Sequence, residues 1–144
     1  MGGELDIHWA SGPHDLSGAI GVREQVFCVE QGVPVEEEID GRDEQALHLV
    51  AVEDGRVVAT LRLLLEGSNA KIGRVAVQRD RRRRGIALRM LDLAVDAARE
   101  HGCERASLAS QLYATGLYEQ AGFAVDSEPF QDAGMPHVWM RMTL

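Results

Sequence analysis

The sequence predicts a mixed α/β (α+β) fold in which helices flank a central, mostly antiparallel sheet. Apolar, β-rich segments follow one another as in a meander, and the Asp54-Gly55 pair between two of them is a strong hairpin signal. Three other segments carry apolar residues at helical spacing. Together these observations predict the element order β-α-β-β-β-α-β-α-β-β.

The N-terminal half begins with a short strand over Leu5–Trp9. An apolar stripe at helical spacing then predicts a helix over Asp15–Gln31, and Gly32 and Pro34 end it. Three strands of a meander follow, over Ala46–Glu53, Arg56–Leu65 and Ala70–Val77.

The C-terminal half opens with the longest predicted helix, Arg84–His101, which has one apolar face. Gly102 stands where a left-handed C-cap is expected. The remaining predicted elements are the strand Arg105–Ala109, the helix Tyr113–Gln120, and two closing strands, Phe123–Asp126 and His137–Met142, around a loop with Pro and Gly.

Length and composition are those of one soluble globular domain over residues 1–144, with 45% hydrophobic and 26% charged residues. No apolar run approaches the roughly 20 residues that span a bilayer, so no membrane partner is expected. The first residues do not resemble a signal peptide. Cys28 and Cys103 lack metal-ligand spacing, which favours reduced thiols, a cytoplasmic location and no bound metal.

Charge is unevenly distributed along a chain whose net charge is −8. Four consecutive arginines, Arg81–Arg84, contrast with acidic residues concentrated between Glu36 and Glu44. This contrast predicts a ligand of mixed character, or two ligands. The acidic segment is either solvated surface or a region that attracts a cationic acceptor. The net acidity argues against a nucleic-acid partner.

The arginine run stands where an apolar strand turns into the longest helix. The first N–H groups of a helix have no partner within it and lie at the positive end of its dipole. Gly85 and the small Ala87 let a diphosphate approach the backbone, while the arginines add forked donors. Each charge-assisted hydrogen bond is worth roughly 1.5–3 kcal/mol. We therefore expect a nucleotide-like pyrophosphate at this turn.

The same stretch resembles motif A of the GNAT superfamily of acyl-CoA N-acyltransferases, because Arg82-x-x-Gly85-x-Ala87 fits Arg/Gln-x-x-Gly-x-Gly/Ala after a strand. The predicted element order also matches the GNAT fold over essentially the whole chain. The resemblance implies that the pyrophosphate belongs to coenzyme A, usually as acetyl-CoA. It assigns cofactor binding at the turn to Arg82, Arg83, Arg84, Gly85, Ile86 and Ala87.

The GNAT resemblance also implies a splayed strand pair, in which exposed strand backbone pairs with pantetheine. Here the backbone of Val75, Ala76 and Val77 would hold pantetheine, and the Val75 N–H would polarise the thioester carbonyl. An ordinary buried strand is the alternative interpretation.

A second segment, Gln111–Phe123, resembles motif B of the family, Phe-Tyr-x-x-x-Gly-Phe. The resemblance assigns Tyr118 the role of donating a proton to the departing CoA thiolate. Full transfer from a phenol of ordinary pKa is uphill by about 2 kcal/mol. Gln111 stands where many relatives have an asparagine that binds pantetheine, and its amide offers the same donor and acceptor. The alternative role for Tyr118 is a core aromatic residue.

A base must also accept the proton of the amine, since neutralising an ordinary alkyl amine at pH 7 costs about 4.6 kcal/mol. Several relatives use a glutamate on the motif A strand, but this strand offers Lys71 and Arg74 and no carboxylate. The candidates are His48, His137 and the acidic segment. We expect His48 to be structural. His137 stands near the closing strands, where acceptor sites often lie in this fold.

The chain is thus identified as a member of the GNAT superfamily, and the run Val26–Pro34 with the acids that follow and His48 resembles its ElaA-like branch. The expected function is transfer of an acetyl group from acetyl-CoA to a primary amine of a small molecule or peptide, directly and in a ternary complex. Two alternatives are a non-catalytic acyl-CoA-binding sensor and a nucleic-acid-binding module. The acceptor and a homodimeric state are left open.

Overall fold

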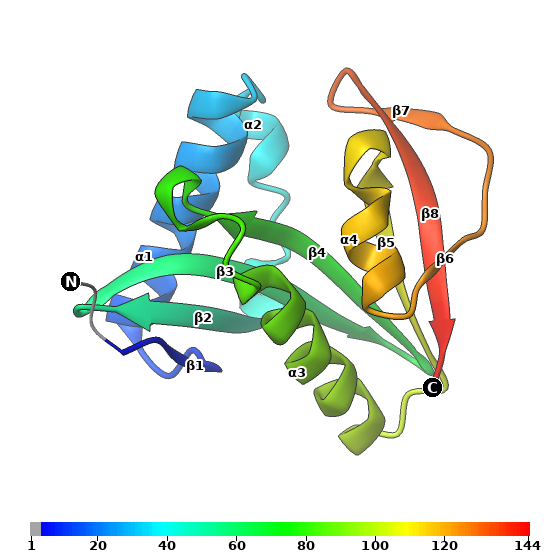
Figure 1. Cartoon of the computed structure of the whole chain (residues 1–144), viewed down its shortest axis with the longest axis horizontal. Coiled ribbons are helices and arrows are strands. Elements are labelled where there is room, and N and C mark those ends of the chain that lie inside the picture. Colours follow the sequence, from blue (N-terminus) through cyan, green and yellow to red (C-terminus); the bar gives the residue numbers. More distant parts are fainter. Residues whose placement is uncertain (1–3) are drawn as a thin grey trace.

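The computed structural model describes residues 4–144, in which eight strands form one sheet in the order β1-β2-β3-β4-β5-β8-β6, with β7 paired to β8 (Figure 1). The strands are β1 (Asp6–Trp9), β2 (Leu47–Glu53), β3 (Arg56–Glu66), β4 (Asn69–Val77), β5 (Arg105–Gln111), β6 (Ala124–Val125), β7 (Phe130–Asp132) and β8 (Met135–Thr143). The β4–β5 pair is parallel and the other described pairs are antiparallel, which confirms the predicted fold class.

Helices cover both faces of this sheet. They are α1 (Pro13–Arg23), η1 (Glu24–Glu30), α2 (Val35–Glu38), η2 (Asp43–Gln45), η3 (Arg79–Arg81), α3 (Ile86–Glu100), η4 (Leu112–Ala114) and α4 (Thr115–Gln120). Side chains alternate across β2, so Leu49 and Ala51 pack in the core with α3. Val50 packs in a second core with Val22 of α1. Helices α1 and α3 therefore lie on opposite faces of the sheet.

A bulge in β4 reverses this alternation at the middle of the strand. Before the bulge, Ala70 and Ile72 face the α3 core, whereas beyond it Val75 and Val77 pack there and Ala76 joins the α1 core. The pairing register with β3 shifts at the same place. Arg74 has a left-handed φ of 51°, which accommodates the extra residue.

Strands β4 and β5 separate soon after they meet. Their pairing ends at Lys71 and Ser107, and β5 then pairs with β8 along its whole length. Figure 1 shows the two strands meeting near the C-terminus of the chain and diverging from there. The splayed strand pair implied by the GNAT resemblance is thus present.

Two predicted helices differ from the observed ones at one end. The predicted helix Asp15–Gln31 begins earlier, at Pro13, and its last turns widen into the π-helix η1. The long helix begins at Ile86 rather than Arg84, because Arg83 (φ 64°) and Gly85 (φ 77°) are left-handed.

The predicted turns are confirmed where glycine is required. Asp54 (φ 53°) and Gly55 (φ 77°) form the expected hairpin turn, and Gly102 (φ 78°) follows α3 in the left-handed region. The loop expected between the closing strands instead contains β7, which forms a hairpin with β8. Cys28 and Cys103 are free thiols. Within residues 4–144 no helix has the length and apolarity needed to cross a bilayer.

Candidate functional site

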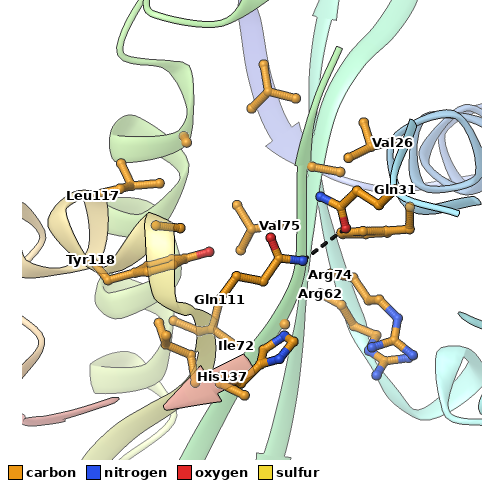
Figure 2. A pocket seen from close by; sticks show the side chains of 18 of the residues that line it. Val26, Gln31, Arg62, Ile72, Arg74, Val75, Gln111, Leu117, Tyr118 and His137 are labelled. Carbon is orange, nitrogen blue, oxygen red and sulfur yellow. Dashed lines mark hydrogen bonds between the residues drawn. The ribbon is translucent and has the colours of Figure 1, made fainter. Parts of the chain in front are cut away.

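A cavity of about 1100 Å³ occupies the gap between the separating strands β4 and β5. All predicted site residues except Arg84 line it. Figure 2 shows Tyr118 and Leu117 of α4 on one side, and Gln31, Arg62 and Arg74 on the other. The fold therefore brings the anion turn, the exposed strand and the predicted tyrosine to one place.

The arginine turn is held in shape by ion pairs. Arg81 donates from Nε to Glu53 (2.6 Å) and lies 2.7 Å from Asp80. Arg82 donates to the Val77 carbonyl and to Glu30 of η1, each at 2.9 Å. Two of the four consecutive arginines, Arg81 and Arg82, therefore have their charges paired within the protein, which also weakens the nucleic-acid interpretation of the basic run.

Arg83 and the first turn of α3 are the parts of the arginine turn that have no partner among the described residues. Within residues 4–144 the Arg83 side chain has no ion-pair partner, and no side chain caps the N-terminus of α3. Ile86 and Ala87 line the cavity, and the N–H groups of a first helical turn have no acceptor within the helix. Arg84 is directed elsewhere, because its Nη1 lies 3.7 Å from Glu53 and it does not line the cavity.

Gln111 reaches across the gap rather than along it. Its Nε2 donates to Oε1 of Gln31 at 2.9 Å, a contact that joins the end of β5 to the residue after η1 (Figure 2). The Gln31 amide in turn lies 3.4 Å from the Tyr113 hydroxyl. Gln111 is thus at the predicted place; its Nε2 is bonded to Gln31, and its Oε1 accepts no hydrogen bond from a described residue.

Tyr118 is buried on α4, with 9% of its surface exposed, yet it lines the cavity. Its hydroxyl points into the cavity toward Val75 and Gln111 (Figure 2). Burial raises the pKa of Tyr118 to about 12. The phenol is therefore neutral at physiological pH and is available as a hydrogen-bond donor.

His137 on β8 lines the same cavity and has a defined tautomer. Its Nδ1 lies 2.9 Å from the Met135 carbonyl, and since a carbonyl only accepts, Nδ1 carries the proton. Nε2 of the neutral ring then holds a free lone pair. Phe130 stacks on the imidazole with ring centroids 6.0 Å apart, which fixes the plane of the ring.

His48 lies away from this cavity. Its Nε2 lies 2.9 Å from the Asp43 carbonyl, and it lines a separate small hollow beside β1 and β2. This placement agrees with the structural role expected for it.

The structure divides the acidic segment, so neither interpretation offered for it holds for all of its residues. Glu38, Asp40 and Asp43 are neither free solvated charges nor a free anionic patch, because arginines neutralise them. Arg23, only 1% exposed, bonds Glu38 (2.5 Å) and Asp43 (2.8 Å). A hydrogen bond from Arg62 holds the pKa of Asp40 well below its usual range. Glu36, Glu37 and Glu44 are exposed and form no ion pair with a described residue.

Sequence reasoning missed Gln31, Arg62 and the aromatic pair Phe130 and Trp139 as cavity residues. Arg62 belongs to an apolar strand and is 4% exposed, so a charged residue within a predicted core strand was the available signal. Phe130 and Trp139 stack at 5.5 Å through the unpredicted β7–β8 hairpin. The sequence carries no local pattern for that contact.

Comparison with known proteins identifies the family. Residues 18–144 match the family model described as an acetyltransferase (GNAT) domain. An uncharacterized N-acetyltransferase of Bacillus subtilis, YjcF, is 33% identical over 132 residues, which covers 91% of this chain and 94% of the relative.

Two solved structures share the fold. An acyl-CoA N-acyltransferase from Pseudomonas aeruginosa is 29% identical with a TM-score of 0.86, covering 96% of this chain and 99% of that one. Escherichia coli ElaA has a TM-score of 0.85 at 23% identity, with 96% and 99% covered. The chain belongs to the GNAT family of acetyltransferases, and it is an acyl-CoA-dependent acyltransferase.

Proposed function

We propose that this protein transfers an acetyl group from acetyl-CoA directly to a primary amine, with both substrates bound together. The observation that carries the proposal is the gap between β4 and β5, which joins the N-terminus of α3 to the Tyr118 hydroxyl in one cavity. Acetyl-CoA supplies the activated acetyl thioester. The proposal treats residues 1–144 as one acyltransferase domain, in the cytoplasmic location that its free thiols favour.

The residues present fit a diphosphate and an extended pantetheine chain. The N–H groups of Ile86 and Ala87 and the Arg83 guanidinium would hold the diphosphate, with Gly85 leaving space beside it. Val75 and Val77 offer strand backbone in the region where β4 has no partner on its β5 side. Gln111 would accept a hydrogen bond from the pantetheine chain at its Oε1, which has no partner among the described residues.

Tyr118 acts in this proposal as a hydrogen-bond donor to the leaving thiolate. Against a thiol of ordinary pKa near 8.5, a phenol with a pKa of about 12 makes full proton transfer uphill by about 5 kcal/mol. Donation without full transfer still stabilises the developing negative charge in a buried site. The Val75 N–H would polarise the carbonyl in the same way.

His137 is the base that we propose for the amine proton. Its tautomer leaves Nε2 as an acceptor, and the contact with Met135 and the stack on Phe130 keep the ring in place. A positioned imidazole reduces the cost of obtaining the neutral amine nucleophile.

Initial rates of thiol release from acetyl-CoA, measured against a broad amine panel, test the proposal. Direct transfer predicts intersecting double-reciprocal lines when both substrates are varied, whereas an acyl-enzyme gives parallel lines. The variant with Cys28→Ser and Cys103→Ser should retain turnover. Tight acetyl-CoA binding without thiol release for any amine would instead favour the sensor, and an acetyl group trapped on a cysteine would exclude direct transfer.

A further inference from the structure

The acceptor end of the cavity is built around an arginine–carboxylate cluster, defined as Arg23, Arg62 and Arg74 with Glu38, Asp40 and Asp43. Arg62 bonds Asp40 through both Nη atoms at 2.9 and 2.7 Å. Three cations meet three carboxylates, so the cluster carries no net charge. Arg62 and Arg74 line the cavity, on the side opposite Tyr118 in Figure 2.

The cluster leaves guanidinium donors unused. The buried Nε atoms of Arg62 and Arg74 and the Nη2 of Arg23 have no hydrogen-bond partner among the described residues, although the Arg74 Nε lies 3.5 Å from a Glu38 carboxylate oxygen, at ion-pair distance. The Arg62 side chain is only 5% exposed. A buried donor without an acceptor is unfavourable, and few occur in native proteins unless a ligand or water satisfies them. The cluster is short of acceptors, not of donors.

Arg74 is the arginine of the cluster that a ligand can reach; the carboxylate of Asp40, 30% exposed, also lines the cavity but is paired with Arg62 and Arg74. The Arg74 side chain is 26% exposed, and its Nη2 donates to the Glu38 carbonyl (2.9 Å) and lies 3.4 Å from Asp40. No described residue accepts a hydrogen bond from Nη1. The left-handed backbone at Arg74 is a strained conformation of the kind found at ligand contacts. Burial and the neighbouring Arg62 lower the pKa of Arg74.

We propose that the acceptor is a primary amine that also carries a carboxylate, and that Arg74, supported by Arg62, binds this carboxylate. This inference rests on the proposed acetyl transfer and names its substrate class. A carboxylate supplies the missing acceptors with a single charge. A doubly charged phosphate would face the adjacent Glu38 and Asp40, and a second ammonium group would find those carboxylates already neutralised.

The test compares ω-amino acids, with one to five carbons between amine and carboxylate, with their amides and with the corresponding amines that lack the carboxylate. We expect kcat/KM for the best acid to exceed that for its amide by about tenfold or more, as loss of a charged hydrogen-bond pair predicts. Arg74→Gln should remove this preference by lowering the value for the acid alone. Arg74→Lys should restore part of the preference for the acid, since lysine keeps the positive charge but lacks the forked guanidinium donors.

Binding measurements separate this inference from the proposed function. Calorimetry with the CoA complex should detect binding of the acid, and Arg74→Gln should abolish it while acetyl-CoA affinity stays unchanged. Arg42→Gln is the matched control, because Arg42 forms an exposed ion pair with Glu66 and does not line the cavity. Preference for amides or diamines, equal losses for acid and amide in Arg74→Gln, or no binding of any acid would overturn the inference. Failure of acetyl-CoA to bind would contradict the proposed function instead.

Discussion

The two ends of the cavity are built in different ways. The donor end, residues 81–87 with the strand before them, is contiguous in sequence and depends on the local geometry of a strand, a left-handed turn and a helix N-terminus. The acceptor end collects Arg62, Arg74 and His137 from separate strands, and α1, α2 and η2 supply Arg23 and its carboxylate partners. Distant Glu53 and Glu30 help to hold the turn of the proposed donor end, but the residues offered there are contiguous, whereas those of the proposed acceptor end come from separate elements.

We expect the largest effect on activity at the proposed acceptor end, from a substitution of His137. His137→Gln should lower kcat by roughly 10²- to 10⁴-fold, because a positioned base contributes about this much, while acetyl-CoA affinity stays unchanged. Steady-state kinetics and calorimetry measure the two quantities. His48→Gln is the matched control, since it removes a buried imidazole outside the cavity. Equal losses of kcat in the two variants would contradict a role for His137 as base.

Glu38→Gln tests whether the acceptor end is also a structural centre. The substitution leaves the buried Arg23 with one of its two carboxylate partners. The free energy of unfolding should therefore fall by about 3–5 kcal/mol. Urea unfolding measures this. Glu37→Gln, the neighbouring exposed residue of α2, should change stability little. If the two variants have the same free energy of unfolding, the buried cluster does not stabilise the fold.

Gly85→Glu tests the donor end. The substitution strains a residue with φ 77° and places a carboxylate where the diphosphate is expected, so acetyl-CoA affinity should fall by roughly a hundredfold. Gly102→Glu is the matched control: Gly102 has φ 78° and open space around it, but it lies at the other end of α3. Calorimetry and thermal unfolding should show similar strain in both variants and a loss of affinity only in the first. Undiminished affinity in Gly85→Glu would place the diphosphate elsewhere.

Tyr118→Phe should lower kcat by roughly 10- to 100-fold with little change in KM for acetyl-CoA, as expected for a hydrogen bond made to a developing charge. Because burial raises the pKa of Tyr118 to about 12, the pH–rate profile should show no tyrosine limb below about pH 10. Tyr113→Phe is the control, since Tyr113 also lines the cavity but is 79% exposed. An unchanged kcat in Tyr118→Phe would remove the hydroxyl from the mechanism.

The smallest expected effect concerns acid stability at the acceptor end. A hydrogen bond from Arg62 lowers the pKa of Asp40 in the folded protein. Its contribution to stability is therefore complete above the ordinary carboxyl pKa and is lost as the pH falls through the lowered value. Asp40→Asn should flatten the acid end of the stability curve, measured by urea unfolding between about pH 2 and 7. Glu36→Gln, at an exposed residue, should leave the pH dependence of stability unchanged. The same change of that dependence in both variants would show that Asp40 is not its source.

Much of the fold and the donor end could be predicted because their causes are local. Asp54 and Gly55 adopt the left-handed pair that a tight hairpin needs, and Gly85 adopts the conformation that lets a strand turn into α3. Helical spacing identified α3, and two short motifs in the expected order identified the family. In each case the physical reason lies within a few residues of chain, so the sequence carries it directly.

The tertiary structure alone decided the acceptor end. Gly73 is a weak local sign of a bulge beside Arg74, but the register with β3 decides that the side chains of β4 reverse there. Nothing near Glu38 indicates that it is buried, since its partners Arg23 and Arg74 are 15 and 36 residues away. The unpredicted strand β7 likewise exists through its pairing with β8. Periodicity and turn chemistry report local backbone preferences, whereas ion pairing and strand register depend on which distant segments folding brings together.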